Sequence, residues 1–107
     1  MRNYVVLVAV ALMSTPGASW ASEHAWKAVA IVHSPDSRDC VFFQLVGVSE
    51  ADQVAPGNPW FAVPKSHLGF KEIFSMLITA RVTGQSVYVS TESSLSCGHP
   101  TVRTVLL

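Results

Sequence analysis

A single stretch of helical periodicity, with short strand-like segments on both sides of it, restricts the fold of this chain most. The apolar residues of that stretch recur at the spacing i, i+3, i+4, i+7 and i+8: Phe70, Ile73, Phe74, Leu77 and Ile78. This spacing places apolar side chains on one face of a helix. Gly84 stands where a helix commonly ends in a left-handed residue, and Ser66 is a candidate N-cap if the helix begins early. We therefore expect a one-sided helix that covers part of a sheet.

Apolar, β-branched and aromatic segments that end at turn residues predict the strands. Three such segments precede the helix and two follow it: residues 25–32, 40–48, 60–63, 85–91 and 101–107. In the fourth strand, Val87 and Val89 would face inward and Tyr88 outward, because side chains alternate along a strand. Residues 92–100 are rich in polar side chains and are interpreted as a loop that carries Cys97.

The resulting element order is three strands, one helix and two strands. This is the order of the OB-fold, a small and partly open five-stranded Greek-key barrel. In such a barrel a one-sided helix covers one end. We therefore expect a mainly β fold (α+β by content), a five-stranded OB-fold-like barrel with one helix between strands 3 and 4. The alternative is a flat sheet with the helix lying across it.

The first 21 residues have the three-part layout of a secretory signal peptide. Arg2 supplies the positive charge, residues 4–13 form an apolar run, and Ser19 and Ala21 are small residues at positions −3 and −1 of a cleavage site. The run is shorter than the roughly 20 residues that a membrane-spanning helix needs. We expect a signal peptide at 1–21, one domain at 22–107, and an exported protein, periplasmic or secreted, without stable membrane insertion after cleavage. An N-terminal membrane anchor is the alternative.

Cys40 and Cys97 are the only two cysteines, and both lie in the part of the chain that would be exported. An oxidising compartment favours a disulfide between them. A chain of this size buries only about 60–65% of its unfolded surface, so a covalent link is useful. On chain-entropy grounds this link would stabilise the fold by about 4 kcal/mol. A metal site formed by Cys40, Cys97 and His99 is the alternative, but the paired ligand spacing typical of zinc sites is missing.

Composition and motifs argue against several classes of function. Seven Lys and Arg balance seven Asp and Glu, so the basic excess typical of nucleic-acid-binding proteins is missing. The sequence contains no Gly-x-Ser-x-Gly motif and no glycine-rich phosphate loop, and its acidic residues form no assignable catalytic pair. The four histidines fall in predicted loops or at strand ends. We therefore expect a non-catalytic protein that uses neither a cofactor nor a metal and does not bind nucleic acid.

Three aromatic residues with a polar group are candidates for binding. Trp26 and Trp60 lie near predicted strand starts, and Tyr88 lies on the outward face of the fourth strand. Such side chains stack on sugar rings and anchor protein partners. In a chain with so small a core, we expect both tryptophans to pack inside rather than to bind a ligand. For Tyr88 the two interpretations have equal weight.

Several short motifs resemble a known family. They are Asp-Cys-Val-Phe at 39–42, Trp-Phe-Ala-Val-Pro at 60–64, Phe-Lys-Glu-Ile-Phe at 70–74, Ala-Arg-Val-Thr-Gly-Gln-Ser-Val-Tyr-Val at 80–89, and Cys97. With these motifs, residues 40–107 resemble the receptor-binding B subunits of subtilase-cytotoxin-like and pertussis-like AB5 toxins, and related small exported bacterial proteins. The resemblance implies an OB-fold, a disulfide from strand 2 to the segment after strand 4, and a ring of five subunits that binds sialylated glycans.

One departure limits what the resemblance transfers. In the toxin subunits a serine in a segment before the first strand contacts the sugar, whereas here only residues 22–25 precede that strand. The resemblance therefore supports the fold and the disulfide but assigns no glycan site. A cell-surface glycan remains the expected ligand, with Tyr88, Ser94 and His99 as the candidate contacts. The alternative is a protein-binding adaptor or inhibitor that uses Trp60 and Phe61. Because an open barrel exposes strand edges, we also expect a homo-oligomer, and the resemblance implies a pentamer.

Overall fold

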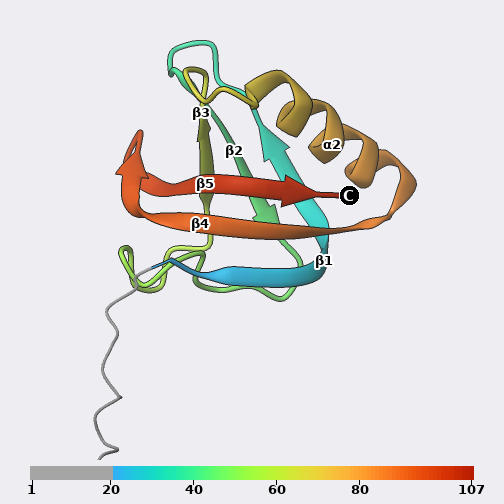
Figure 1. The fold of residues 1–107 in the computed structure, drawn as a ribbon, viewed down its shortest axis with the longest axis horizontal. Coiled ribbons are helices and arrows are strands. Elements are labelled where there is room, and N and C mark those ends of the chain that lie inside the picture. Colours follow the sequence, from blue (N-terminus) through green and yellow to red (C-terminus); the bar gives the residue numbers. More distant parts are fainter. Residues whose placement is uncertain (1–20) are drawn as a thin grey trace, which may run out of the picture.

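The computed structural model describes residues 21–107, and it contains five strands and one helix (Figure 1). In chain order they are β1 (Glu23–His33), β2 (Cys40–Leu45), β3 (Phe61–Pro64), α2 (Phe70–Thr83), β4 (Ser86–Ser96) and β5 (His99–Leu106). The expected mainly β fold, with one helix between the third and fourth strands, is confirmed. The predicted signal peptide lies outside the described residues except for Ala21. No helix within the described range is long and apolar enough to cross a membrane.

The strand pairings close the sheet on itself. β1 pairs antiparallel with β2 and with β4, β2 pairs antiparallel with β3, and β5 pairs antiparallel with β4. A short parallel contact between β3 and β5, at Ala62 and Thr101, completes the order β1-β2-β3-β5-β4. A flat sheet would leave two strands with a single neighbour, whereas each strand described here has two. Every strand described here thus has a neighbour on both sides, although β3 and β5 pair at a single position.

The core lies between the inner face of the sheet and one face of the helix. Phe43 of β2 and Phe61 of β3 stack inside it, with ring centroids 4.8 Å apart and planes 7° apart. Val87 and Val89 are fully buried while Tyr88 between them is partly exposed, so the predicted alternation of β4 is confirmed. A stacked aromatic pair such as Phe43 and Phe61 contributes about 0.5–1.5 kcal/mol beyond the area that it buries.

The helix lies against the sheet with a face that differs slightly from the predicted one. Ile73, Leu77 and Ala80 are its buried residues, whereas Ile78 is 40% exposed. The buried positions are thus rotated toward the side of Ala80. The small Ala80 side chain is buried there, whereas the larger Ile78 side chain stays largely outside the core.

The two predicted helix ends have different outcomes. Gly84 adopts the left-handed conformation, with φ of 78°, and its N–H bonds to the carbonyl of Ala80, as predicted. Ser66 is not the N-cap. The helix begins at Phe70, and its N-cap is Gly69, which makes no side-chain cap bond. A turn at His67 organises the chain before it, because the ring Nδ1 of His67 accepts a bond from the Gly69 N–H at 2.9 Å.

The polar loop predicted at residues 92–100 is wrong. β4 continues to Ser96 and turns into β5 through two residues, Cys97 and Gly98, with Ser96 paired to His99. Both turn residues have positive φ, 52° and 84°, as the tightest hairpin turns require. The hairpin places Cys97 at its tip, where the chain reverses.

The prediction that Trp26 packs in the core is also wrong. Trp26 is 56% exposed and has a positive φ of 58°. It lies where the register between β1 and β4 shifts, between His24 and Lys27. The irregularity turns the indole outward, toward Tyr88, at a ring-centroid distance of 6.2 Å.

Candidate functional site

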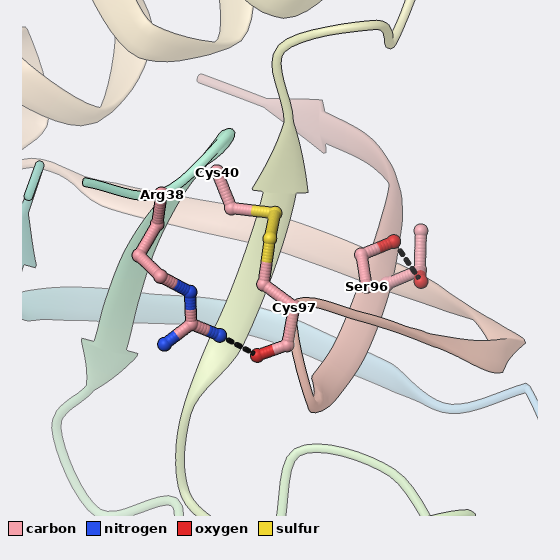
Figure 2. Close-up of a disulfide and its surroundings, with 5 residues drawn as sticks. Arg38, Cys40, Ser96 and Cys97 are labelled. Atoms are coloured by element: carbon pink, nitrogen blue, oxygen red, sulfur yellow. Dashed lines mark hydrogen bonds between the residues drawn. A yellow bond between two sulfur atoms is a disulfide. The ribbon is translucent and has the colours of Figure 1, made fainter. Parts of the chain in front are cut away.

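A disulfide joins the beginning of β2 to the β4–β5 turn. The sulfur atoms of Cys40 and Cys97 are 2.06 Å apart and the Cα atoms 6.5 Å apart (Figure 2). The predicted pairing is confirmed. The metal site considered for Cys40, Cys97 and His99 is excluded, because both sulfur atoms are bonded to each other. Residues 21–107 contain no cluster of three or more His, Cys, Asp or Glu that could hold a metal ion.

Arg38 also links the segment before β2 to the β4–β5 turn. Its guanidinium donates a hydrogen bond to the main-chain carbonyl of Cys97, beside the disulfide (Figure 2). The carbon at the centre of the guanidinium also lies 5.4 Å from the centroid of the Phe42 ring, which is a cation–π distance. These two contacts hold an exposed, permanently charged group in one position.

A pocket of about 350 Å³ lies next to Arg38 and the disulfide. We call it the aromatic pocket, and its lining residues are His33, Pro35, Ser37, Arg38, Phe42, Trp60 and His99. They come from the end of β1, the β1–β2 loop, β2, the residue before β3, and the start of β5. Three stretches of chain that are separate in the sequence, at 33–42, 60 and 99, therefore meet in one cavity.

The rings of the aromatic pocket contact one another. The His99 ring packs edge-on against Phe42 at a centroid distance of 5.1 Å and lies 6.5 Å from Trp60. The His33 ring lies 6.3 Å from Trp60 and 6.2 Å from Phe42. Trp60 is partly buried and packs against the small cluster that contains Phe42 and the disulfide. The expectation that Trp60 packs inside is thus met only in part, because its ring also lines the cavity.

Asn58 fixes two walls of the aromatic pocket at once. Its side-chain carbonyl accepts a bond from the main-chain N–H of Trp60 at 3.0 Å. Its side-chain NH₂ donates to Nδ1 of His99 at 2.9 Å. A neutral imidazole that accepts at Nδ1 carries its proton on Nε2. The His99 ring therefore offers an N–H donor at its other nitrogen.

The protonation of His99 is set by its surroundings. Burial lowers the pKa of His99 below the ordinary value of 6.5, and the nearby Arg38 charge lowers it further. His99 is therefore neutral at pH 7 and donates only through Nε2–H. Arg38 supplies a permanent positive charge to the aromatic pocket.

A second, more polar pocket of about 580 Å³ lies beside the beginning of β1 and the middle parts of β4 and β5. We call it the polar pocket; its lining residues are Ala21, Ser22, Glu23, Tyr88, Ser90, Thr91, Arg103 and Thr104. A hydrogen bond with Glu23 raises the pKa of the Tyr88 hydroxyl above the ordinary value of 10.0, with smaller contributions from burial and from the Glu23 charge. Tyr88 and Glu23 thus line the same pocket.

The structure divides the candidate residues between different surfaces. Trp60 and His99 share the aromatic pocket, whereas Tyr88 lines the polar pocket. Ser94 is exposed on β4 and lines neither of them. Phe61, named with Trp60 for a protein-binding patch, is fully buried and presents no surface.

Sequence reasoning missed Arg38, Phe42, His33 and Asn58 as members of the site. Asn58 lies in a Pro-Gly-Asn-Pro segment whose only visible signal was a turn. The position of Arg38 two residues before Cys40 is a signal that could have found it, because a disulfide brings the neighbours of both cysteines together.

Comparison of the chain with protein-family models, with curated proteins and with solved structures finds no match. The functional assignment therefore depends on the chemistry of the two pockets.

Proposed function

We propose that this chain is an exported, non-catalytic binding protein that holds a cell-surface glycan in the aromatic pocket. The observation that carries the proposal is the meeting of Trp60, His99 and Arg38 in one cavity held by a disulfide. The volume of the aromatic pocket, about 350 Å³, falls in the range of small-molecule sites, about 300–1,000 Å³.

The chemistry of the lining favours a sugar with an acidic group. Aromatic faces such as that of Trp60 stack on the apolar side of a sugar ring. Around that face stand hydrogen-bond donors, the Nε2–H of His99 and the guanidinium of Arg38. Guanidinium groups bind carboxylates with paired hydrogen bonds. A glycan that carries a carboxylate satisfies both the stacking surface and the cation.

The same proposal includes the OB-fold. Its support is the order of five strands with one helix between the third and fourth, the closed pairing order in which β5 lies between β3 and β4, and the resemblance given above. OB-folds bind oligosaccharides and oligonucleotides. The balanced charge of this chain favours the first class.

Export is proposed from the signal-like segment and the disulfide. Disulfides persist in oxidising compartments and are rare in the cytosol. A periplasmic or secreted location therefore suits both features, and cleavage after Ala21 would release the domain at 22–107.

We propose in addition that the domain forms a homo-oligomer, a pentamer as the resemblance implies. Its support in the fold is the exposed outer face of α2, where Val82 is 79% and Ile78 40% exposed. Exposed apolar side chains that share one helix face can form a contact surface for a second copy of the chain. Native mass measurement at micromolar concentration tests this: an assembly of five supports the pentamer, and a monomer alone contradicts it.

A protein-binding adaptor or inhibitor remains the second candidate. With Phe61 buried, its surface would have to use other apolar residues, among which Leu68 is fully exposed in the loop before α2. A screen of the oxidised protein against a glycan array separates the two candidates. Binding to acidic glycans that is lost in Arg38→Gln supports the aromatic pocket, and the absence of any glycan signal ends the glycan proposal.

A further inference from the structure

A buried carboxylate, that of Asp52, lies close to Ser22, near the start of the described residues. Asp52 is only 1% exposed. One of its carboxylate oxygens accepts a bond from the Val54 N–H at 2.9 Å, and the other accepts from the hydroxyl of Thr91, which is fully buried. Neither of these two bonds comes from a cationic side chain. A buried carboxylate without a cation is costly to fold.

Ser22 lies directly against this pair. Its main-chain N donates to the hydroxyl oxygen of Thr91 at 2.9 Å, and its carbonyl accepts from the Thr91 N–H at 2.9 Å. Two reciprocal bonds to Thr91 thus hold the Ser22 nitrogen in one position. The Thr91 hydroxyl thus bonds to both the Ser22 nitrogen and the Asp52 carboxylate.

Ser22 is also the residue that would become the N-terminus after cleavage. Hydrolysis of the Ala21–Ser22 bond by an export peptidase consumes one water molecule. The carboxylate remains on Ala21, and the released amine of Ser22 takes up a proton, since an α-amino group has a pKa of about 7.7–8.0. The nitrogen that now donates one bond as an amide would become a cation with three donors.

We propose that cleavage after Ala21 supplies the missing cation for Asp52: the new α-ammonium group of Ser22 binds the Thr91–Asp52 pair and stabilises the mature domain. The inference rests on the export and cleavage proposed above. The Thr91 hydroxyl accepts from the ammonium group and donates to the carboxylate, so it links the two charges. Processing of the precursor would then complete a buried polar network.

Other charged and titratable groups face the same region. Glu23, Tyr88 and Arg103 line the polar pocket beside Ser22, and the ring Nε2 of His24 lies 2.8 Å from the carbonyl of Ala51. Glu23 is exposed, so solvent screens its attraction for the ammonium group more than that of the buried Asp52. Arg103 would repel the ammonium group and is exposed as well. Asp52 is therefore the group whose removal should matter most.

The test compares two forms of the chain 22–107 that differ by one chemical group. They carry either a free or an acetylated Ser22 amine and are made by chemical synthesis with ligation at Cys40. We expect acetylation to raise the unfolding equilibrium constant about tenfold or more, the amount typical for hydrogen bonds to charged groups. In Asp52→Asn the acetylation effect should disappear. Equal stability of the two forms, or an effect that persists in Asp52→Asn, overturns the inference.

Two controls keep the test decisive. Thr91→Ser keeps the hydroxyl and should keep the acetylation effect, whereas Thr91→Val should lose it.

If Asp52→Asn does not fold, the rate at which an acylating reagent modifies the α-amine of the wild-type chain tests the inference instead. Slower modification in the folded protein than in a free peptide of residues 22–39 supports the inference, and equal rates overturn it. The intact mass of the exported protein tests cleavage separately, so a failure of processing is distinguishable from a failure of the Asp52 pairing.

Discussion

The guanidinium of Arg38 donates a hydrogen bond to the main-chain carbonyl of Cys97, the residue whose sulfur is bonded to Cys40. Arg38 and Cys40 are two residues apart, as are Cys97 and His99. The disulfide and the hydrogen bond therefore join the same two segments, and each segment contributes a polar group to the aromatic pocket. The covalent link is thus part of the site's construction as well as of the fold's stability.

Replacing both cysteines tests that link. In the double variant Cys40→Ser, Cys97→Ser we expect the free energy of unfolding to fall by about 4 kcal/mol, because the unfolded chain regains its loop entropy. Denaturant unfolding measures the change. As a control, a reductant should destabilise the wild type by a similar amount and leave the double variant unchanged. Equal stability of the oxidised wild type and the variant would contradict the prediction.

His99 should titrate below its ordinary range. Burial and the Arg38 charge lower the pKa of His99 in the folded protein, so the unfolded chain binds a proton there more readily. Stability from this group therefore rises with pH through the interval between the lowered pKa and 6.5, and it is lost as the pH falls through that interval. NMR titration of the ring should give a midpoint below 6.5.

Arg38→Gln provides the control for His99. The midpoint should move upward in this variant but stay below the ordinary value, because burial is the larger cause. A wild-type midpoint at or above 6.5 would show that the His99 ring is not held as described.

Leu77 should be the most sensitive position of α2, because it is fully buried against the sheet. We expect Leu77→Ala to cost about 2–5 kcal/mol, the usual range for such a truncation in a core. Lys71→Ala, at an exposed position on the same helix, should change the stability by less than about 0.5 kcal/mol. Similar losses in both variants would show that the helix face is assigned incorrectly.

The exported protein should lack its first 21 residues. Small side chains at Ser19 and Ala21 fit the cleavage site, and the apolar run before them is too short to anchor the chain in a bilayer. Intact mass of protein recovered from periplasm or medium measures the cleavage. A mass that still includes residues 1–21 would favour the N-terminal anchor instead.

Much of the fold follows from patterns that burial imposes on the sequence. Val87 and Val89 face the core and Tyr88 does not, so the alternation of β4 was visible in the residue types alone. The same logic fails at residues 92–95, which are exposed. A hairpin arm without a buried face carries no hydrophobic alternation, so its sequence resembles that of a loop.

The candidate site was less predictable for a geometric reason. Trp60 and His99 are 39 positions apart in the sequence, and long-range links such as the β3–β5 contact and the disulfide bring them together. Arg38 and Asn58 join them through single hydrogen bonds to a main-chain carbonyl and to a ring nitrogen. Such bonds leave no periodic signal in a sequence. Trp26 was wrongly predicted for a different reason. Its outward position depends on a local irregularity of β1 that strand propensity alone does not predict.

The most direct measurement of the central claim is a binding titration of an acidic glycan against the oxidised protein and three matched variants. Trp60→Ala removes the stacking face of the aromatic pocket, while Trp26→Ala and Tyr88→Ala each remove an aromatic side chain elsewhere. We predict that the wild type binds and that Trp60→Ala weakens binding by about tenfold or more, as expected for an aromatic anchor in a binding site. Trp26→Ala and Tyr88→Ala should bind as the wild type does. Undiminished binding by Trp60→Ala would contradict the account.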